Sequence, residues 1–93
     1  MKFGANTFIW VSPFRTEAFD VVQKIANLGF DVVEIAFEQP DLIDIRKLKS
    51  ILKNSGLEVA TCGAFGLDRD LISEDLQKRQ NSKNYVKQCL DYA

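Results

Sequence analysis

Hydrophobic residues form a nearly continuous run near the middle of the chain, with one carboxylate inside it. The run covers residues 29–37 and reads Gly-Phe-Asp-Val-Val-Glu-Ile-Ala-Phe. Its length and its β-branched and aromatic content are typical of a parallel strand covered on both faces, because an open-faced strand alternates more cleanly. Strand side chains point alternately to the two faces, which places Glu34 among small residues, opposite Val33, Ile35 and Phe37.

Glu34 is therefore expected to point into the interior of the fold. An unpaired carboxylate in such a place would cost several kcal/mol, so it must meet a cation, hydrogen-bond donors or water. We interpret Glu34 as an interior polar residue held by its neighbours, with a catalytic role as the less favoured alternative.

The segments on either side alternate between strand-like and helix-like patterns. The pattern predicts strands over residues 3–8, 30–37 and 57–62, and helices over about 17–28, between Asp44 and Gly56, and from Ser73 onwards. Thr16, Asp44 and Ser73 are the expected N-terminal caps, and Gly29 and Gly56 are expected to end the first two helices. The expected inner faces of the three helices are Ala18, Val22, Ile25 and Ala26, then Ile45, Leu48, Ile51 and Leu52, then Leu76, Val86, Cys89, Leu90 and Ala93.

The strands begin at evenly spaced positions, Phe3, Phe30 and Leu57, and the last two starts share a local pattern. Asn-Leu-Gly-Phe-Asp-Val precedes and opens the second, and Asn-Ser-Gly-Leu-Glu-Val the third. Repeated strand–helix units of this kind predict right-handed crossovers and a parallel sheet. We expect an α/β fold, a parallel (β/α)3 segment with strand order 1-2-3 and helices outside. Eight such units make a (β/α)8 barrel of about 250 residues, so residues 1–93 are expected to be a fragment or to be completed by partner chains.

Composition narrows the classes of function. The net charge is −1 and no dense basic patch occurs, which disfavours nucleic acid and acidic membrane surfaces as partners. The opening residues are too short and too mixed for a signal peptide or a membrane span, and a cytoplasmic location is expected. Cys62 and Cys89 lie outside any metal-ligand spacing and are expected to be free thiols. Histidine is absent, which removes Ser-His and Cys-His nucleophiles and His-containing metal sites from this chain.

Several short motifs, in order, carry a family resemblance. They are Gly-Ala-Asn-Thr-Phe-Ile-Trp near the start, Leu-Gly-Phe-Asp-Val-Val-Glu-Ile in the centre, Thr-Cys-Gly-Ala-Phe-Gly after it, and Asp-Leu-Ile-Ser from Asp70, followed by Arg79 and Tyr85. Together they resemble the N-terminal third of the ketose 3-epimerases, which include the D-tagatose and D-psicose 3-epimerases of the xylose-isomerase-like barrels.

This resemblance implies a (β/α)8 barrel that binds one divalent ion, manganese, magnesium or cobalt, at the carboxyl ends of its strands. It also implies two glutamates that exchange the C3 proton of a ketose through an enediolate. Those glutamates and the metal ligands belong to later strands of such barrels, so we expect no catalytic residue, no metal ligand and no cofactor in this chain alone.

The resemblance further implies part of a sugar pocket, formed by Asn6, Trp10, Phe14, Gly63, Ala64 and Phe65. Trp10 and Phe14 suit a wall for the apolar face of a sugar, or else are ordinary loop anchors. The better-known members carry an aromatic residue where Asn6 stands and a tryptophan where Phe14 stands, so a different ketose or a sugar phosphate remains open. Asp68, Arg69 and Asp70 are expected to be a solvated loop cluster.

Two hypotheses follow. The first is part of a metal-dependent sugar isomerase or epimerase of carbohydrate metabolism, inactive as this chain alone, with a small sugar as its partner and with association into a homo-oligomer or through sheet edges. The alternative is a non-catalytic α/β interaction module completed by partner chains. An endonuclease-like barrel is disfavoured by the lack of a basic face.

Overall fold

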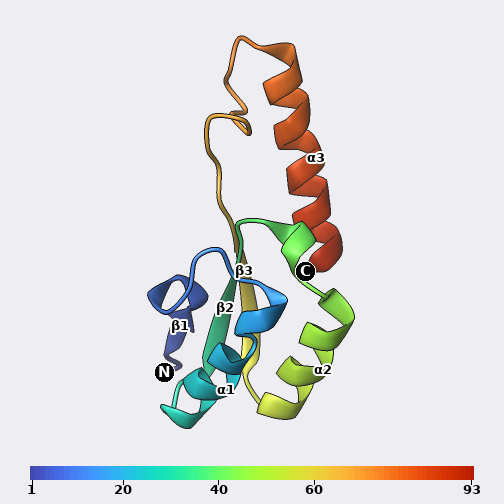
Figure 1. Ribbon diagram of the computed structural model, residues 1–93. Coiled ribbons are helices and arrows are strands. Elements are labelled where there is room, and N and C mark those ends of the chain that lie inside the picture. The colour runs from blue at the N-terminus through green and yellow to red at the C-terminus, as the bar shows by residue number, and fades with distance from the viewer.

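Three parallel strands form one sheet in the order β1-β2-β3 (Figure 1). The computed structural model describes all residues 1–93. The strands are β1 (Gly4–Asn6), β2 (Val32–Phe37) and β3 (Glu58–Gly63), and both pairings are parallel. The predicted parallel (β/α)3 segment with strand order 1-2-3 is confirmed.

Three α-helices alternate with the strands, and short 3-10 turns occupy the loops. The helices are α1 (Asp20–Asn27), α2 (Ile45–Ser55) and α3 (Leu76–Tyr92), and the turns are η1 (Thr7–Ile9), η2 (Thr16–Ala18) and η3 (Pro40–Leu42). α1 and α2 run beside the sheet, whereas the loop after β3 rises beyond the carboxyl ends of the strands and α3 runs back from its top towards α2 (Figure 1). No helix is long and apolar enough to cross a membrane.

The register of the strands separates an apolar face from a polar one. Ala5 is aligned with Val33, and Asn6 with Glu34. Adjacent residues of paired parallel strands share a face, so the apolar positions of β1 and β2 line up under α1 and α2. The core consists of these positions and the inner faces of the helices: Ala5, Phe14, Phe19, Val21, Val22, Ile25, Val33, Ile35, Phe37, Ile43 and Leu48.

The predicted ends of α2 are confirmed, and those of α1 only in part. The Asp44 side chain accepts a hydrogen bond from the Lys47 amide at 3.1 Å, and Gly56 follows α2 with φ at 75°. Gly29 likewise has φ at 92°, where glycine carries no steric penalty. Thr16 as cap is wrong, because its hydroxyl donates to the Leu42 carbonyl and accepts from the Asp44 amide. The α-helix therefore begins only at Asp20, after the turn η2.

The first strand is shorter than the pattern predicted. Its ladder ends at Asn6, whose side-chain oxygen accepts a 2.8 Å hydrogen bond from the Phe8 amide and turns the chain into η1. An asparagine side chain at such a point competes with the strand ladder for the backbone. The polar residue that was expected inside the strand therefore ends it.

The predicted inner face of the last helix is wrong in part: Cys89 packs against the core and Val86 is half-buried, but the two leucines face outwards. Leu76 and Leu90 are 71% and 70% exposed, whereas Ser82 is fully buried and Tyr85 is 5% exposed. The helix also begins later than expected, because Asp75 caps it by accepting from the Gln77 amide and Ser73 lies before it. The pattern of apolar residues does not reveal the buried face of α3, because Ser82 and Tyr85, and not the leucines, are buried on it.

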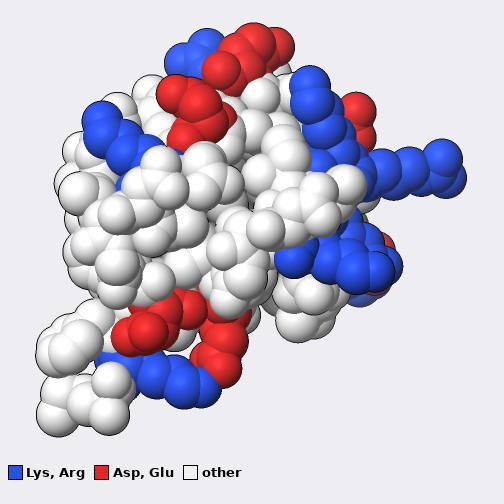
Figure 2. Space-filling model, turned by 90° about the horizontal axis from the view of Figure 1, so that it is seen from below, with Lys and Arg blue, Asp and Glu red and all other residues white.

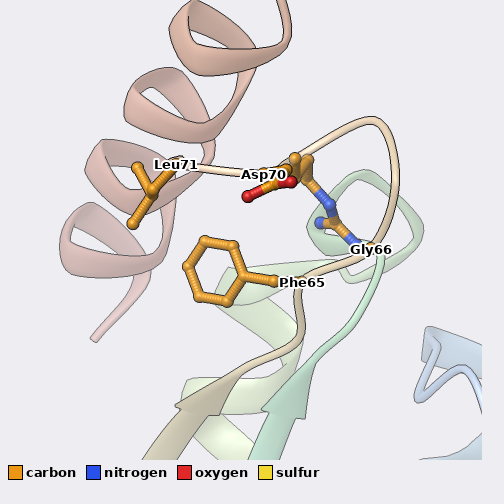
Figure 3. Close-up of a pocket in the computed structure, with 5 residues that line it drawn as sticks. Phe65, Gly66, Asp70 and Leu71 are labelled. Atoms are coloured by element: carbon orange, nitrogen blue, oxygen red, sulfur yellow. The ribbon is translucent and has the colours of Figure 1, made fainter. Parts of the chain in front are cut away.

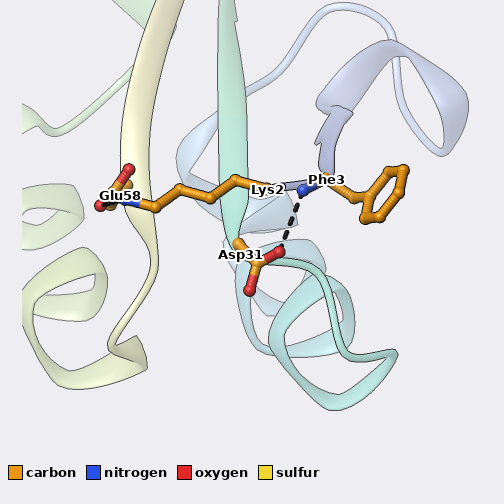
Figure 4. A network of polar contacts seen from close by, with 4 residues as sticks. All are labelled: Lys2, Phe3, Asp31 and Glu58. Atoms are coloured by element: carbon orange, nitrogen blue, oxygen red, sulfur yellow. Dashed lines mark hydrogen bonds and ion pairs between the residues drawn. The ribbon is translucent and has the colours of Figure 1, made fainter.

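The amino ends of the strands are tied together by charge. Lys2 forms an ion pair with Glu58, and the Phe3 amide donates a 3.0 Å hydrogen bond to the Asp31 carboxylate (Figure 4). The hydrogen bond that Lys2 donates to Glu58 raises the pKa of Lys2. Seen from this end, acidic and basic side chains lie around a largely uncharged middle (Figure 2). Both partners of the ion pair are exposed, so it contributes little to stability.

Candidate functional site

A row of polar side chains crosses all three strands on the face opposite the core. The Asn6 side-chain amide, at the end of β1, donates to the Glu34 carboxylate on β2 and to the Cys62 thiol on β3, the latter at 3.4 Å. All three residues are half-buried. Glu34 therefore meets a hydrogen-bond donor, as its position in an apolar strand required.

The environment of Cys62 keeps its thiol protonated. Burial raises the pKa of Cys62 above its ordinary value of 9.0, the hydrogen bond from Asn6 lowers it, and the nearby Glu34 charge raises it. A thiol with a raised pKa is a poor nucleophile. Cys62 and Cys89 are both free, as predicted.

The two aromatic residues after β1 lie in different environments. Trp10 ends η1, is half-buried and packs against the edge of the core. Phe14 has no exposed surface, and its ring centroid lies 5.4 Å from that of Phe19. Trp10 thus retains surface that a ligand can reach, whereas Phe14 contributes to core packing and offers none.

The segment after β3 is held by one residue of α3. Gly63 is the last residue of β3, and the Ala64 amide donates a 2.8 Å hydrogen bond to the Tyr85 hydroxyl. The Phe65 ring meets the Tyr85 ring edge to face, with centroids 5.4 Å apart, and remains 54% exposed. Burial raises the pKa of Tyr85, which the Ala64 hydrogen bond and the Arg69 charge partly offset.

An open cavity of about 350 Å³ lies beyond the end of β3 (Figure 3). Its lining is Phe65, Gly66, Arg69, Asp70 and Leu71. In Figure 3 the Phe65 ring lies between the strand ends and the part of the loop that carries Asp70 and Leu71. The expectation of a purely solvated Arg69 is wrong, because its guanidinium carbon lies 3.9 Å above the centre of the Tyr85 ring. The cation–π contact orders this part of the loop.

A second, polar cleft lies between the segment after β2, the loop after β3 and α3. Several of its polar groups already bond one another: Gln88 donates to Asp41, and Asn81 donates to the Asp68 carbonyl. These groups therefore hold the surrounding segments together.

The predicted pocket residues fall into two groups at the same end of the sheet. Asn6 ends β1 and Trp10 follows it, while Gly63 ends β3 and Ala64 and Phe65 follow it. The two groups are linked by the hydrogen bond from Asn6 to Cys62, the residue before Gly63. Of the six residues only Phe65 lines the cavity described above. Sequence reasoning gave no role to Tyr85 or to the Asn6–Cys62 contact. The spacing of Tyr85, Cys89 and Tyr92 along one helix face was the available signal for the first.

A divalent ion does not fit the residues of this chain. No three His, Cys, Asp or Glu side chains lie close enough together to hold a metal. Near Glu34 the other polar groups are a carboxamide and a protonated thiol, which are weak partners for a hard cation. We therefore derive no chemical step through a metal held by these residues.

Curated proteins similar to this chain are ketose 3-epimerases. A protein named "Probable ketose 3-epimerase" from Synechocystis sp. is 32% identical over 92 residues, which are 99% of this chain and 32% of that protein. The ketose 3-epimerase of Arthrobacter globiformis is 33% identical over 76 residues, 81% of this chain and 26% of that protein. The chain thus spans about a third of the length of these relatives. No protein-family model matches it.

Solved structures with the same fold are also 3-epimerases. A D-allulose 3-epimerase from Methylomonas sp. superposes with a TM-score of 0.89 over 99% of this chain and 32% of that one, at 22% identity. The D-psicose 3-epimerase of Clostridium cellulolyticum H10, solved with D-tagatose, gives a TM-score of 0.76 at 26% identity over 99% of this chain and 33% of that one. The three βα units therefore have the fold of a part of a barrel enzyme.

Proposed function

We propose that this chain forms the N-terminal three βα units of a (β/α)8 barrel that epimerises a ketose at C3. The whole chain is similar to about a third of the length of the ketose 3-epimerases. The observation that carries the proposal is the match of nearly the entire chain to ketose 3-epimerases in sequence, together with the fold. The non-catalytic interaction module is not favoured, since no comparison points to one.

In this proposal the chain supplies binding surface, and other parts of the barrel supply the chemistry. Epimerisation at C3 requires a base to remove the C3 proton and an acid to return one on the opposite face. The metal ion that the family implies, manganese, magnesium or cobalt, would polarise the adjacent oxygens. Neither the acid–base pair nor the metal ligands belong to this chain in the proposal.

The residues proposed to meet the sugar are Asn6, Trp10, Gly63, Ala64 and Phe65. Trp10 and Phe65 keep exposed ring surface at the carboxyl ends of the strands, where barrel enzymes bind their substrates. Rings of this kind pack against the apolar C–H faces of sugars. The full burial of Phe14 leads us to assign it to the core and not to the pocket.

Replacing Trp10 by alanine in the complete enzyme tests the pocket. Loss of an aromatic wall is worth about 1–3 kcal/mol, which lowers kcat/KM on the preferred ketose by about 5- to 150-fold. The matched control is Phe3→Ala, which removes an exposed ring at the opposite end of β1 and should leave kcat/KM unchanged. Because Trp10 also packs on the core, rates are compared well below the melting temperature. An unchanged kcat/KM in Trp10→Ala would refute the pocket assignment.

The 93-residue chain alone is expected to epimerise no ketose and to bind no divalent ion tightly. The physical reason is that its carboxylates do not cluster. Titration with manganese in a calorimeter measures this directly, and a stoichiometric, submicromolar signal would contradict it. The free edges of β1 and β3 make association, as a homo-oligomer or through the sheet, the proposed behaviour of the isolated chain.

A further inference from the structure

One buried tyrosine joins four parts of the structure at the open end of the sheet. Tyr85 on α3 contacts the last residue of β2, the first residue after β3, the Phe65 ring and the Arg69 side chain. We propose that Tyr85 is a positioning residue of the sugar pocket, holding the segment Gly63–Phe65 in the place where it meets the substrate. This inference rests on the proposed function.

The hydroxyl of Tyr85 bridges the ends of two paired strands. It donates to the Phe37 carbonyl and accepts from the Ala64 amide, at 2.8 Å. Phe37 is paired with Gly63, the last pair of the β2–β3 ladder. Beyond this pair the strands separate, so the Ala64 amide has no further β2 partner. The hydroxyl therefore fixes where the chain leaves the sheet.

The ring of Tyr85 contacts Phe65 of this segment and Arg69 of the loop that follows it. Phe65 meets it edge to face, at 88°, and the Arg69 guanidinium covers its face. A β-carbon on Gly63 would lie 3.4 Å from the hydroxyl oxygen and 3.5 Å from Cε1, so the backbone passes in van der Waals contact with the ring. The segment is thus held by a hydrogen bond and by ring packing, and the cation–π contact holds the loop that follows it.

Tyr85 acts through its neighbours and does not touch the sugar itself. It is only 5% exposed, whereas Phe65, which rests on it, is 54% exposed. The contacts that it positions are the same in the ground state and in the transition state. Losing them should raise KM and leave kcat nearly constant, which is the signature of uniform binding.

Tyr85→Phe is the decisive variant, made in the complete enzyme. It removes the hydroxyl and keeps the ring that packs on Phe65. The matched control is Tyr92→Phe, on the same helix, because Tyr92 also packs on Phe37, with ring centroids 5.7 Å apart, but makes no side-chain hydrogen bond. Two quantities are measured: hydrogen exchange of the Ala64 amide, and KM and kcat for the preferred ketose.

In Tyr85→Phe we expect exchange at Ala64 to become at least about ten-fold faster, and KM to rise at least about five-fold with kcat within about two-fold. The control should change neither quantity. Unchanged exchange would overturn the inference, and so would faster exchange with an unchanged KM, since Tyr85 would then serve stability alone. A wild-type enzyme that turns over no ketose would refute the proposed function, while the exchange of Ala64 would still report on the hydroxyl.

Discussion

The bond between Asn6 and Glu34 offers the sharpest test of how the polar face of the sheet is held together. Asn6→Ala removes the donor to Glu34 and to Cys62, and also the acceptor of the Phe8 amide. A hydrogen bond to a charged group contributes about 1.5–3 kcal/mol when buried. Both residues are only half-buried, so water replaces part of it and we expect about 1–2 kcal/mol for this bond.

The remaining loss comes from the turn into η1. The Asn6 side chain caps that turn through the Phe8 amide, and loss of such a cap costs about 0.5–2 kcal/mol. The total for Asn6→Ala is therefore about 1.5–4 kcal/mol in the free energy of unfolding. Asn27→Ala is the matched control, because Asn27 is exposed and its side chain bonds only Gln23 on the surface of α1. It should cost less than about 0.5 kcal/mol.

A double-mutant cycle separates the two contributions. Urea unfolding, followed by Trp10 fluorescence, is compared for wild type, Asn6→Ala, Glu34→Ala and the double variant. Loss of the η1 cap occurs in both variants that carry Asn6→Ala, so it cancels in the cycle. What remains is the coupling energy between Asn6 and Glu34, expected at about 1–2 kcal/mol. A coupling below about 0.3 kcal/mol would mean that water satisfies Glu34 equally well, and the account of the polar row would be wrong.

Two further outcomes concern the core and the thiol. Leu48→Ala, at a position 1% exposed, should lower the free energy of unfolding by about 2–5 kcal/mol, whereas Leu90→Ala, 70% exposed, should cost less than about 0.5 kcal/mol; equal losses in denaturant unfolding would contradict the observed faces of α2 and α3. Because the pKa of Cys62 is raised in the folded state, the protonated thiol stabilises the fold below its ordinary value of 9.0, and this contribution is lost as pH rises from there through the folded pKa. Cys62→Ala should reduce the loss of unfolding free energy above pH 9 and leave its pH dependence near pH 7 unchanged. An equal alkaline loss in the variant would show that another group causes it.

The parallel sheet could be predicted from the sequence because the signals for it are local and repeated. Gly29 and Gly56 each adopt the positive φ that ends a helix directly before a strand, and Asp44 caps α2. Such features depend on a few neighbouring residues, so a pattern reveals them without the tertiary structure. The apolar face of β2 followed in the same way from the period of two.

Thr16 and α3 were mispredicted because their environment is set by distant parts of the chain. The Thr16 hydroxyl bonds the segment that enters α2 and so does not cap its own helix. Tyr85 is buried because the Phe37 carbonyl and the Ala64 amide need partners where the strands end. Neither bond has a local signature, and a scale that counts leucines places the wrong face of α3 inwards.

The two faces of the sheet differ in a way that bears on what can cover them. On the face under α1 and α2, Val33, Ile35 and Phe37 of β2 are all at most 2% exposed. The other face carries half-buried Glu34 and Cys62, exposed Ala60 and buried Ala36, a mixture of small and polar side chains. Small and polar side chains suit the inward face of a curved sheet, where strands crowd together and water or a polar ligand meets them. The hydrogen bond from Asn6 holds this face at its carboxyl end, and Tyr85 holds the loop beside it, so both lie at the end of the sheet where we propose that the sugar binds.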